Sequence, residues 1–353
     1  MVLNSYLDRR EFLKKSGAVG LAVSGLMYSS TNTAKGEPKK PDIKVGLYSV
    51  TFSGVWYDGP ALSVKEVLNK AKSLGYDGIE LGAKRPHISP LDVDKNGCSE
   101  IRKLADSLGL EICAVSSYNN FTNPIVEQRE NEILMLKEQM RVARDLGVKI
   151  LRIFAAWNGI TMEDGKAKYD DAARAWSIAF PMVTREQKWK WCRECLEESA
   201  KNAKKYGVTL ALQNHEPLIE SYKDVLALIN EVGSENLKAC HDAPLLKFQN
   251  DEHVRQSVID VGKNLLVHSH FGGEYAKKSD GTIYQTKFRP DREDTNYPTF
   301  VKTLAEIGYK GYISYELCHP YKIEGKYGAL KDSEQQAALS LEYMRNIINK
   351  TVV

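Results

Sequence analysis

Short apolar segments alternate with longer amphipathic segments from residue 44 to the end of this chain, and the alternation predicts a single-domain (β/α)8 barrel, the TIM barrel. The apolar segments are nearly continuous and rich in β-branched residues, which is typical of parallel strands covered by helices. There are eight of them, the number that closes a barrel, and roughly 300 residues lies within the usual size of that fold. Several predicted helices also end in a glycine directly before the next strand, as helix C-caps do.

The alternation gives each element a predicted range. Strands are expected at 44–50, 77–81, 110–116, 149–155, 208–213, 237–241, 264–269 and 311–316. Helices are expected at 63–74, 97–108, 126–146, 184–206, 221–232, 250–261, 297–307 and 332–350. The glycines at the helix-to-strand junctions are Gly75, Gly109, Gly147, Gly207 and Gly308. Doubly wound open sheets share this pattern, but eight units of this length fit a barrel better.

Two connections are longer than a compact domain usually needs. They span 156–183 and 271–296, and both follow predicted strands. Loops in that position lie on the face where lids and binding walls form.

The first 34 residues are expected to lie outside the barrel, which would occupy 42–353. The run Asp8-Arg9-Arg10-Glu11-Phe12-Leu13-Lys14 precedes an apolar stretch rich in Gly and Ala. This layout resembles a twin-arginine export signal, although Asp8 stands where Ser or Thr is usual and no clear cleavage site is visible. The apolar stretch is too short to span a bilayer. The resemblance implies a periplasmic protein with no stable membrane span, and a basic arm is the alternative.

The charge and the absent motifs limit the function. The net charge is +3, and residues 1–34 contribute four basic and two acidic side chains, so the remainder carries 3 − 2 = +1. That charge gives no electrostatic footprint for nucleic acid. Phosphate-binding glycine motifs are absent, so no nucleotide cofactor is expected. Cys113 and Cys240 fall inside predicted strands and are expected to be reduced structural thiols, with one disulfide left open.

Polar side chains gather at the ends of the last four predicted strands. The clusters are Gln213-Asn214-His215-Glu216, His241-Asp242, His268-Ser269-His270, and Glu316 with His319. The carboxyl ends of barrel strands converge on the axis. Imidazole, carboxylate and amide oxygen together suit a divalent cation.

The order of these clusters, with Gly78-Ile79-Glu80-Leu81 at the second strand, resembles the xylose-isomerase-like superfamily of sugar isomerases and epimerases. Endonucleases of the endonuclease IV type belong to the same superfamily. The resemblance implies a small-molecule sugar substrate and one divalent ion of Mn, Zn, Co or Mg, and it leaves homo-oligomerisation open. The ligands that it implies here are Gln213, Asp242, His270 and Glu316.

Gln213 departs from the family pattern, in which many relatives have Glu. An amide keeps an oxygen ligand but cannot act as a base. The base is therefore expected among Glu316, His215, Glu216, His241 and Glu80. Gln213 could instead cap a helix or hold a turn, and Glu80 could hold a neighbouring ligand.

A substrate pocket is expected from side chains after the other strands. Aromatic faces stack on sugar rings, and polar groups bind hydroxyls or a carboxylate. The candidates are Trp56, Tyr118, Trp157, His87, Arg152 and His319. Arg152 could equally form a structural ion pair inside the barrel.

These features predict a metal-dependent sugar isomerase or epimerase that removes a proton next to a chelated carbonyl and hydroxyl pair. One alternative is a metal-dependent lyase or hydrolase on glycosides or 3-keto-glycosides. A second is a sugar-binding barrel without catalysis, which Gln213 favours. A phosphodiesterase of the endonuclease IV type is disfavoured because the charge is low.

Overall fold

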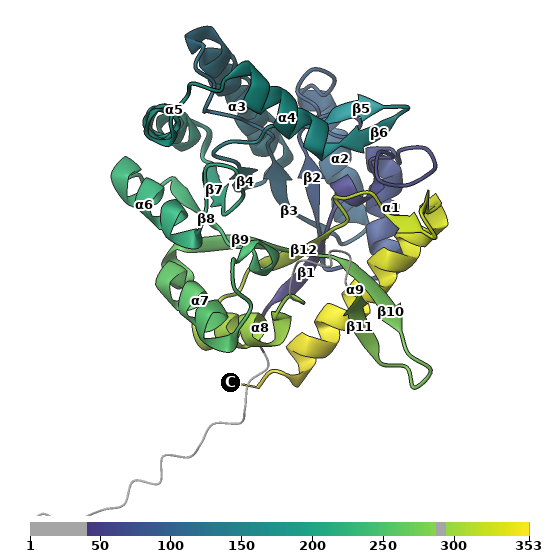
Figure 1. Cartoon of the computed structure of the whole chain (residues 1–353). Helices are drawn as coiled ribbons and strands as arrows, with labels where there is room; N and C mark the ends of the chain where they lie inside the picture. Colours follow the sequence, from purple (N-terminus) through teal and green to yellow (C-terminus); the bar gives the residue numbers. More distant parts are fainter. Residues whose placement is uncertain (1–40, 287–293, 353) are drawn as a thin grey trace, which may run out of the picture. The chain divides into compact units, whose positions relative to one another are not determined.

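The computed structural model describes residues 41–286 and 294–352, and Figure 1 shows a ring of helices around a central barrel. The predicted signal segment, 1–34, lies outside the described residues. The barrel strands are β1 (Lys44–Tyr48), β2 (Gly78–Gly82), β3 (Glu111–Ser116), β4 (Ile150–Ile153), β7 (Thr209–Gln213), β8 (Leu237–Cys240), β9 (Leu266–Gly272) and β12 (Tyr312–Glu316). They close in the order β1-β12-β9-β8-β7-β4-β3-β2, and every pair is parallel. The predicted (β/α)8 barrel is confirmed.

The helices that cover the barrel follow the predicted register. They are α1 (Val64–Leu74), α2 (Lys95–Ser107), α3 (Val126–Leu146), α5 (Arg185–Tyr206), α6 (Tyr222–Val232), α7 (Asp251–Leu265), α8 (Tyr297–Glu306) and α9 (Leu330–Lys350). Gly75, Gly147 and Gly207 cap α1, α3 and α5 in the left-handed conformation, with φ of 92°, 78° and 67°. No helix within the described residues is long and apolar enough to cross a membrane.

Both long connections contain secondary structure that was not predicted. The first holds a hairpin of β5 (Thr161–Glu163) and β6 (Lys166–Lys168), followed by α4 (Tyr169–Ala179). The second holds a hairpin of β10 (Glu274–Lys277) and β11 (Ile283–Thr286). Short strands of three or four residues give little periodic signal, but Asp164-Gly165 is a recognised hairpin turn sequence. Both of its residues have positive φ, 50° and 74°.

Three strands end two or more residues away from their predicted limits. The first predicted strand was to reach residue 50, but β1 stops at Tyr48 and the chain enters a short 3-10 helix, η2 (Ser49–Phe52). β4 ends at Ile153, two residues early, whereas β9 continues to Gly272, three residues late. His270 therefore lies within β9 and not after it.

Side-chain alternation along the strands separates an apolar layer from a polar interior. Leu81, Leu151 and Leu212 are fully buried in the hydrophobic core. The residues next to them along the same strands, such as Glu80 and Arg152, carry polar side chains that are also buried. Because neighbouring strand residues point to opposite faces, the polar side chains point into the barrel.

Two further short elements complete the chain. A 3-10 helix, η3 (Ala243–Leu245), follows β8, and a hairpin of β13 (Lys322–Ile323) and β14 (Lys326–Tyr327) precedes α9.

Candidate active site

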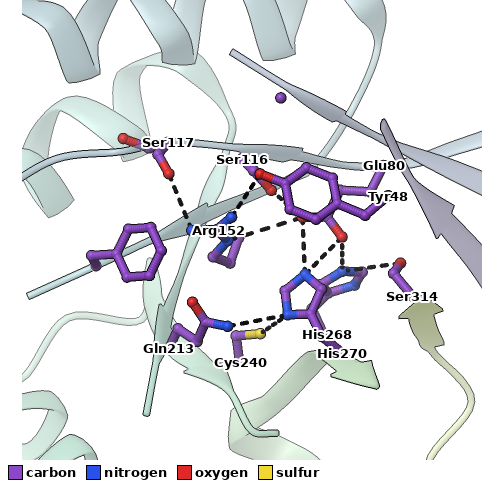
Figure 2. Close-up of polar contacts among 12 residues, drawn as sticks. Tyr48, Glu80, Ser116, Ser117, Arg152, Gln213, Cys240, His268, His270 and Ser314 are labelled. Atoms are coloured by element: carbon purple, nitrogen blue, oxygen red, sulfur yellow. Dashed lines mark hydrogen bonds and ion pairs between the residues drawn. The ribbon is translucent and has the colours of Figure 1, made fainter. Parts of the chain in front are cut away.

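A buried carboxylate lies at the centre of the polar interior. Glu80 of β2 is fully buried, and its Oε2 lies 2.7 Å from His268 Nε2 and 2.8 Å from His270 Nε2. Ser116 donates a hydrogen bond to the same carboxylate. Figure 2 shows the two imidazoles facing Glu80. Residues two apart in a strand share a face, so β9 presents His268 and His270 together.

Asp242 joins this network from the position just after β8. Its Oδ1 accepts a hydrogen bond of 2.7 Å from the backbone N–H of His270, and its Oδ2 lies 3.1 Å from His270 Nδ1. Gln213 also donates its side-chain N–H to Oδ2. Burial raises the pKa of Asp242, but the charge of His270 and the hydrogen bonds from His270 and Gln213 together outweigh it and bring the pKa to about 2. Burial alone would lower the pKa of His270, yet Glu80 and Asp242 raise it well above its usual value.

Cys240 is a member of the site that the sequence interpretation missed. Its Sγ lies 3.5 Å from His270 Nδ1 and 3.4 Å from Asp242 Oδ1. The expectation of a thiol that packs as a small hydrophobe is wrong, because this side chain contacts two polar groups inside the barrel. Its spacing of two residues from Asp242 was the available signal.

The donor atoms fit a divalent cation. Two groups have ligand atoms within 4.8 Å of one another: Glu80 with His268 and His270, and Cys240 with Asp242 and His270. The amide of Gln213 contacts the second group through Nε2, and its Oε1 is buried without a hydrogen-bond partner among the described residues. An unpaired buried oxygen is costly, and the amide turned over would present it to a cation held by Asp242 and His270. Glu80 engages His270 Nε2 and leaves Nδ1 facing the donors, as carboxylate partners of metal-binding histidines do.

Glu316 lies at the end of β12 and is only partly buried. Desolvation raises its pKa, and the charges of Asp242 and Glu80 act in the same direction. It belongs to neither donor group in the described part of the chain. Its predicted roles as ligand and base stay predictions.

Arg152 of β4 points into the barrel and is 2% exposed. Its Nη2 donates to Tyr48 Oη at 2.9 Å and its Nη1 to the Ser117 carbonyl at 3.1 Å, while Nε is 4.0 Å from Glu80 Oε1. Figure 2 shows Arg152 beside Tyr48 and Glu80. The two interpretations of Arg152 are therefore compatible: it lies inside the barrel and forms an ion pair there.

A second cation lies on the same side of the barrel mouth. Lys84 Nζ is 3.9 Å from the ring centroid of Tyr118, whose hydroxyl is 2.5 Å from that of Tyr48. Burial lowers the pKa of Lys84 to about 8. Lys84, Tyr118 and Glu132 line a cavity of about 540 Å³. The predicted role of Tyr118 in substrate binding stays a prediction.

Aromatic side chains form two stacks in the loops around the mouth. Trp157 stacks on Phe154 with centroids 5.0 Å apart, and His215 meets both rings edge-on. Trp56 stacks on Tyr169 of α4 at 5.1 Å. The predicted Trp56 and Trp157 thus belong to aromatic stacks, and Tyr169 was not predicted.

His215 and Glu216 follow the end of β7. His215 Nδ1 lies 2.6 Å from the backbone carbonyl of Glu216, whose side chain is exposed. Burial lowers the pKa of His215. Neither residue belongs to the two donor groups.

Three other predicted site histidines belong to neither donor group among the described residues. His241 Nε2 is 3.0 Å from Ser257 Oγ of α7, so His241 faces the helices, and its position does not support a catalytic role. His87 is 9% exposed, and burial lowers its pKa to about 4. His319 Nε2 lies 3.1 Å from a carboxylate oxygen of Glu274 on β10.

The chain belongs to the xylose isomerase-like TIM barrel family, whose model matches residues 68–347. It is similar to the fructoselysine 3-epimerase of Escherichia coli O157:H7, with 25% identity over 290 residues, 79% of this chain and 94% of that protein. Among solved structures, the D-psicose 3-epimerase of Clostridium cellulolyticum H10 has a TM-score of 0.62 at 18% identity and covers 86% of this chain and 99% of its own. The 3-keto-D-glucoside 4-epimerase of E. coli has a TM-score of 0.58 at 17% identity, covering 87% and 100%.

Proposed function

We propose that this protein is a sugar epimerase or isomerase that holds one divalent cation at the barrel mouth. The cluster of Cys240, Asp242 and His270 supports the cation most directly, because one ligand atom from each lies within 4.8 Å of the others, and the Gln213 side-chain amide contacts Asp242 and His270. The similarity to fructoselysine 3-epimerase supports the sugar class.

The chain's own residues divide the work. Asp242, His270 and Gln213 would hold the cation, and Glu80 fixes the His270 ring by its contact with Nε2. When bound, the cation supplies Lewis acidity toward adjacent sugar carbonyl and hydroxyl oxygens. Glu316, at the end of β12 and next to β9, would take the proton from the carbon between them, and burial raises its pKa.

The destination of the proton decides the product. Its return to the neighbouring carbon gives an isomerase, and its delivery to the opposite face of the same carbon gives an epimerase. The second outcome needs another donor, because Gln213 cannot carry a proton. The hydroxyl of Tyr118, which follows β3, would be one such group.

Proton exchange tests the proposal. In deuterated water, the wild type should incorporate deuterium at a carbon next to the carbonyl of a keto-sugar, and Glu316→Gln should lose at least about 100-fold of that rate. Glu324→Gln, an exposed change in the turn between β13 and β14, is the control. Binding without exchange in the wild type would instead identify a sugar-binding barrel.

A lyase or hydrolase on 3-keto-glycosides is the second candidate. Gln213 favours it, because elimination of a leaving group needs one proton abstraction and no second base on the opposite face. Release of the aglycone from a 3-keto-glucoside, without a new sugar epimer, would establish this outcome.

We also propose export to the periplasm through the twin-arginine-like segment. Replacing Arg9 and Arg10 by Lys should retain the full-length chain in the cytoplasm. Export of the double variant at the wild-type level would contradict this.

A further inference from the structure

Cys240 occupies the position of a ligand. Its Sγ is 3.5 Å from His270 Nδ1 and 3.4 Å from Asp242 Oδ1, and that His270 nitrogen is 3.1 Å from Asp242 Oδ2. The three side chains are all buried. Cys240 ends β8, Asp242 follows it two residues later, and His270 lies on the neighbouring strand β9. The barrel itself therefore positions all three.

The spacing matches the edges of a small coordination sphere. Zinc binds sulfur at about 2.3 Å, imidazole nitrogen at about 2.0–2.1 Å and carboxylate oxygen at about 2.0–2.2 Å, so ligand atoms around a tetrahedral ion lie about 3.4–3.6 Å apart. The two distances from Cys240 Sγ, 3.5 and 3.4 Å, agree with that spacing. The third distance, 3.1 Å between the nitrogen and Asp242 Oδ2, is shorter and involves the other oxygen of the same carboxylate. Asp242 Oδ1 also accepts the backbone N–H of His270, which holds the carboxylate in place.

Other buried cysteines have different surroundings. Cys113 Sγ contacts the Ser314 hydroxyl at 3.9 Å, and Cys192 Sγ contacts the carbonyl of Ala155 at 3.7 Å. Neither belongs to a group of possible ligands among the residues described. Burial within a strand does not by itself place a thiol against an imidazole and a carboxylate.

The charge of the site gives a reason for a thiolate. Gln213 is neutral, so Asp242 is the only carboxylate in the group that contains Cys240. A thiolate would add a second negative charge beside the cation.

We propose that Cys240 is a metal ligand and that the site selects zinc over manganese and magnesium. On binding, the S–H bond breaks, the proton passes to solvent, and the sulfur electron pair is donated to the ion. Thiolate ligands favour zinc, whereas oxygen-only sites suit magnesium and manganese. The inference rests on the cation site of the proposed function.

Cobalt(II) substitution tests this ligand directly. The full chain, freed of metal and titrated with Co²⁺, should show a sulfur-to-cobalt charge-transfer band in the near ultraviolet. Cys240→Ser should lose that band and still bind Co²⁺, and Cys113→Ser, a matched buried strand thiol, should keep it. The ratio of Zn²⁺ to Mn²⁺ affinity should fall at least about tenfold in Cys240→Ser and remain unchanged in Cys113→Ser.

The outcomes separate the two proposals. Co²⁺ that binds to the wild type without the band, or a band that survives in Cys240→Ser, overturns the role of Cys240 and leaves the cation site intact. Failure of the wild type to bind Co²⁺, Zn²⁺ or Mn²⁺ by elemental analysis overturns the site as well. The wild-type spectrum needs no variant, so instability of Cys240→Ser cannot hide the answer.

Discussion

The two sides of the barrel mouth carry opposite chemistry. On the side of β7, β8 and β9, Gln213, Cys240 and Asp242 present a side-chain amide, a thiol and a carboxylate. On the side of β2 to β4, Arg152 and Lys84 place two cations against tyrosine rings. The first side therefore suits a bound cation, and the second suits the oxygen-rich face of a substrate. Glu80 connects the two sides, because it contacts both imidazoles of β9 and the arginine of β4.

Removing a donor should have the largest effect. We expect Asp242→Ala to lose at least about 100-fold in Zn²⁺ affinity and nearly all activity, because it removes a charged ligand and the partner of His270 Nδ1. Calorimetric titration with Zn²⁺ measures this loss. Asp260→Ala, a change on α7 whose carboxylate contacts Tyr222, is the control for an aspartate that bonds a side chain outside the mouth. Full zinc occupancy in Asp242→Ala would contradict the assignment of the cation to the side of β7, β8 and β9.

Replacing Glu80, the carboxylate that connects the two sides, should affect both of them. We expect Glu80→Gln to lower metal affinity about 10–100-fold, because Glu80 orients His270. It should also destabilise the fold by roughly 3 kcal/mol, because Arg152 stays buried without its charge partner. The double variant Glu80→Gln with Arg152→Met should regain stability and not metal affinity. Equal recovery of both would show that Glu80 does not act separately on the two sides.

Glu132, on the cationic side, should give the protein a pH-dependent stability. Burial raises the pKa of Glu132 from 4.5 to about 7, so the folded protein holds this proton more tightly than the unfolded chain. The stability from Glu132 is complete below pH 4.5 and is lost as the pH rises through 7. We expect Glu132→Gln to be more stable than the wild type by roughly 2 kcal/mol at pH 8, allowing for partial exposure.

Urea unfolding at pH 4.5 and pH 8 measures this difference. Glu130→Gln, an exposed change on the same helix, is the control. A constant difference between Glu132→Gln and the wild type at the two pH values would contradict the assignment.

The smallest effect should come from the outward-facing histidine. We expect His241→Gln to lose about 1 kcal/mol of stability with its hydrogen bond to Ser257. Turnover should stay within about twofold of the wild type, because the side chain lies outside both regions of the mouth. Thermal unfolding and steady-state kinetics measure the two quantities, and a large fall in turnover with unchanged stability would restore its catalytic assignment.

The sequence predicted the barrel because strand composition and glycine caps repeat in each unit. It also brought Gln213, Asp242 and His270 together, because the ends of neighbouring parallel strands must converge. Strand alternation, applied residue by residue, would have gone further. It places Cys240 on the face of Asp242 and His241 on the opposite face.

Contacts across the closed barrel could not be predicted in this way. The approach of Arg152 to Glu80, and the chain from Arg152 through Tyr48 to Tyr118, depend on the curvature of the sheet and the rotamers of long side chains. Nothing in the local sequence around Arg152 specifies those partners. The Asp164-Gly165 hairpin, in contrast, had a local signal that could have been used.

The two contacts of the His270 ring have a consequence for its tautomer. With a metal on Nδ1, the single ring proton must reside on Nε2, where the Glu80 carboxylate accepts it. Turning the ring over would break the contacts at both nitrogens, so the imidazole has one preferred orientation. In the metal-loaded protein its ¹⁵N resonances should therefore report a single Nε2–H tautomer that does not exchange when substrate enters and leaves.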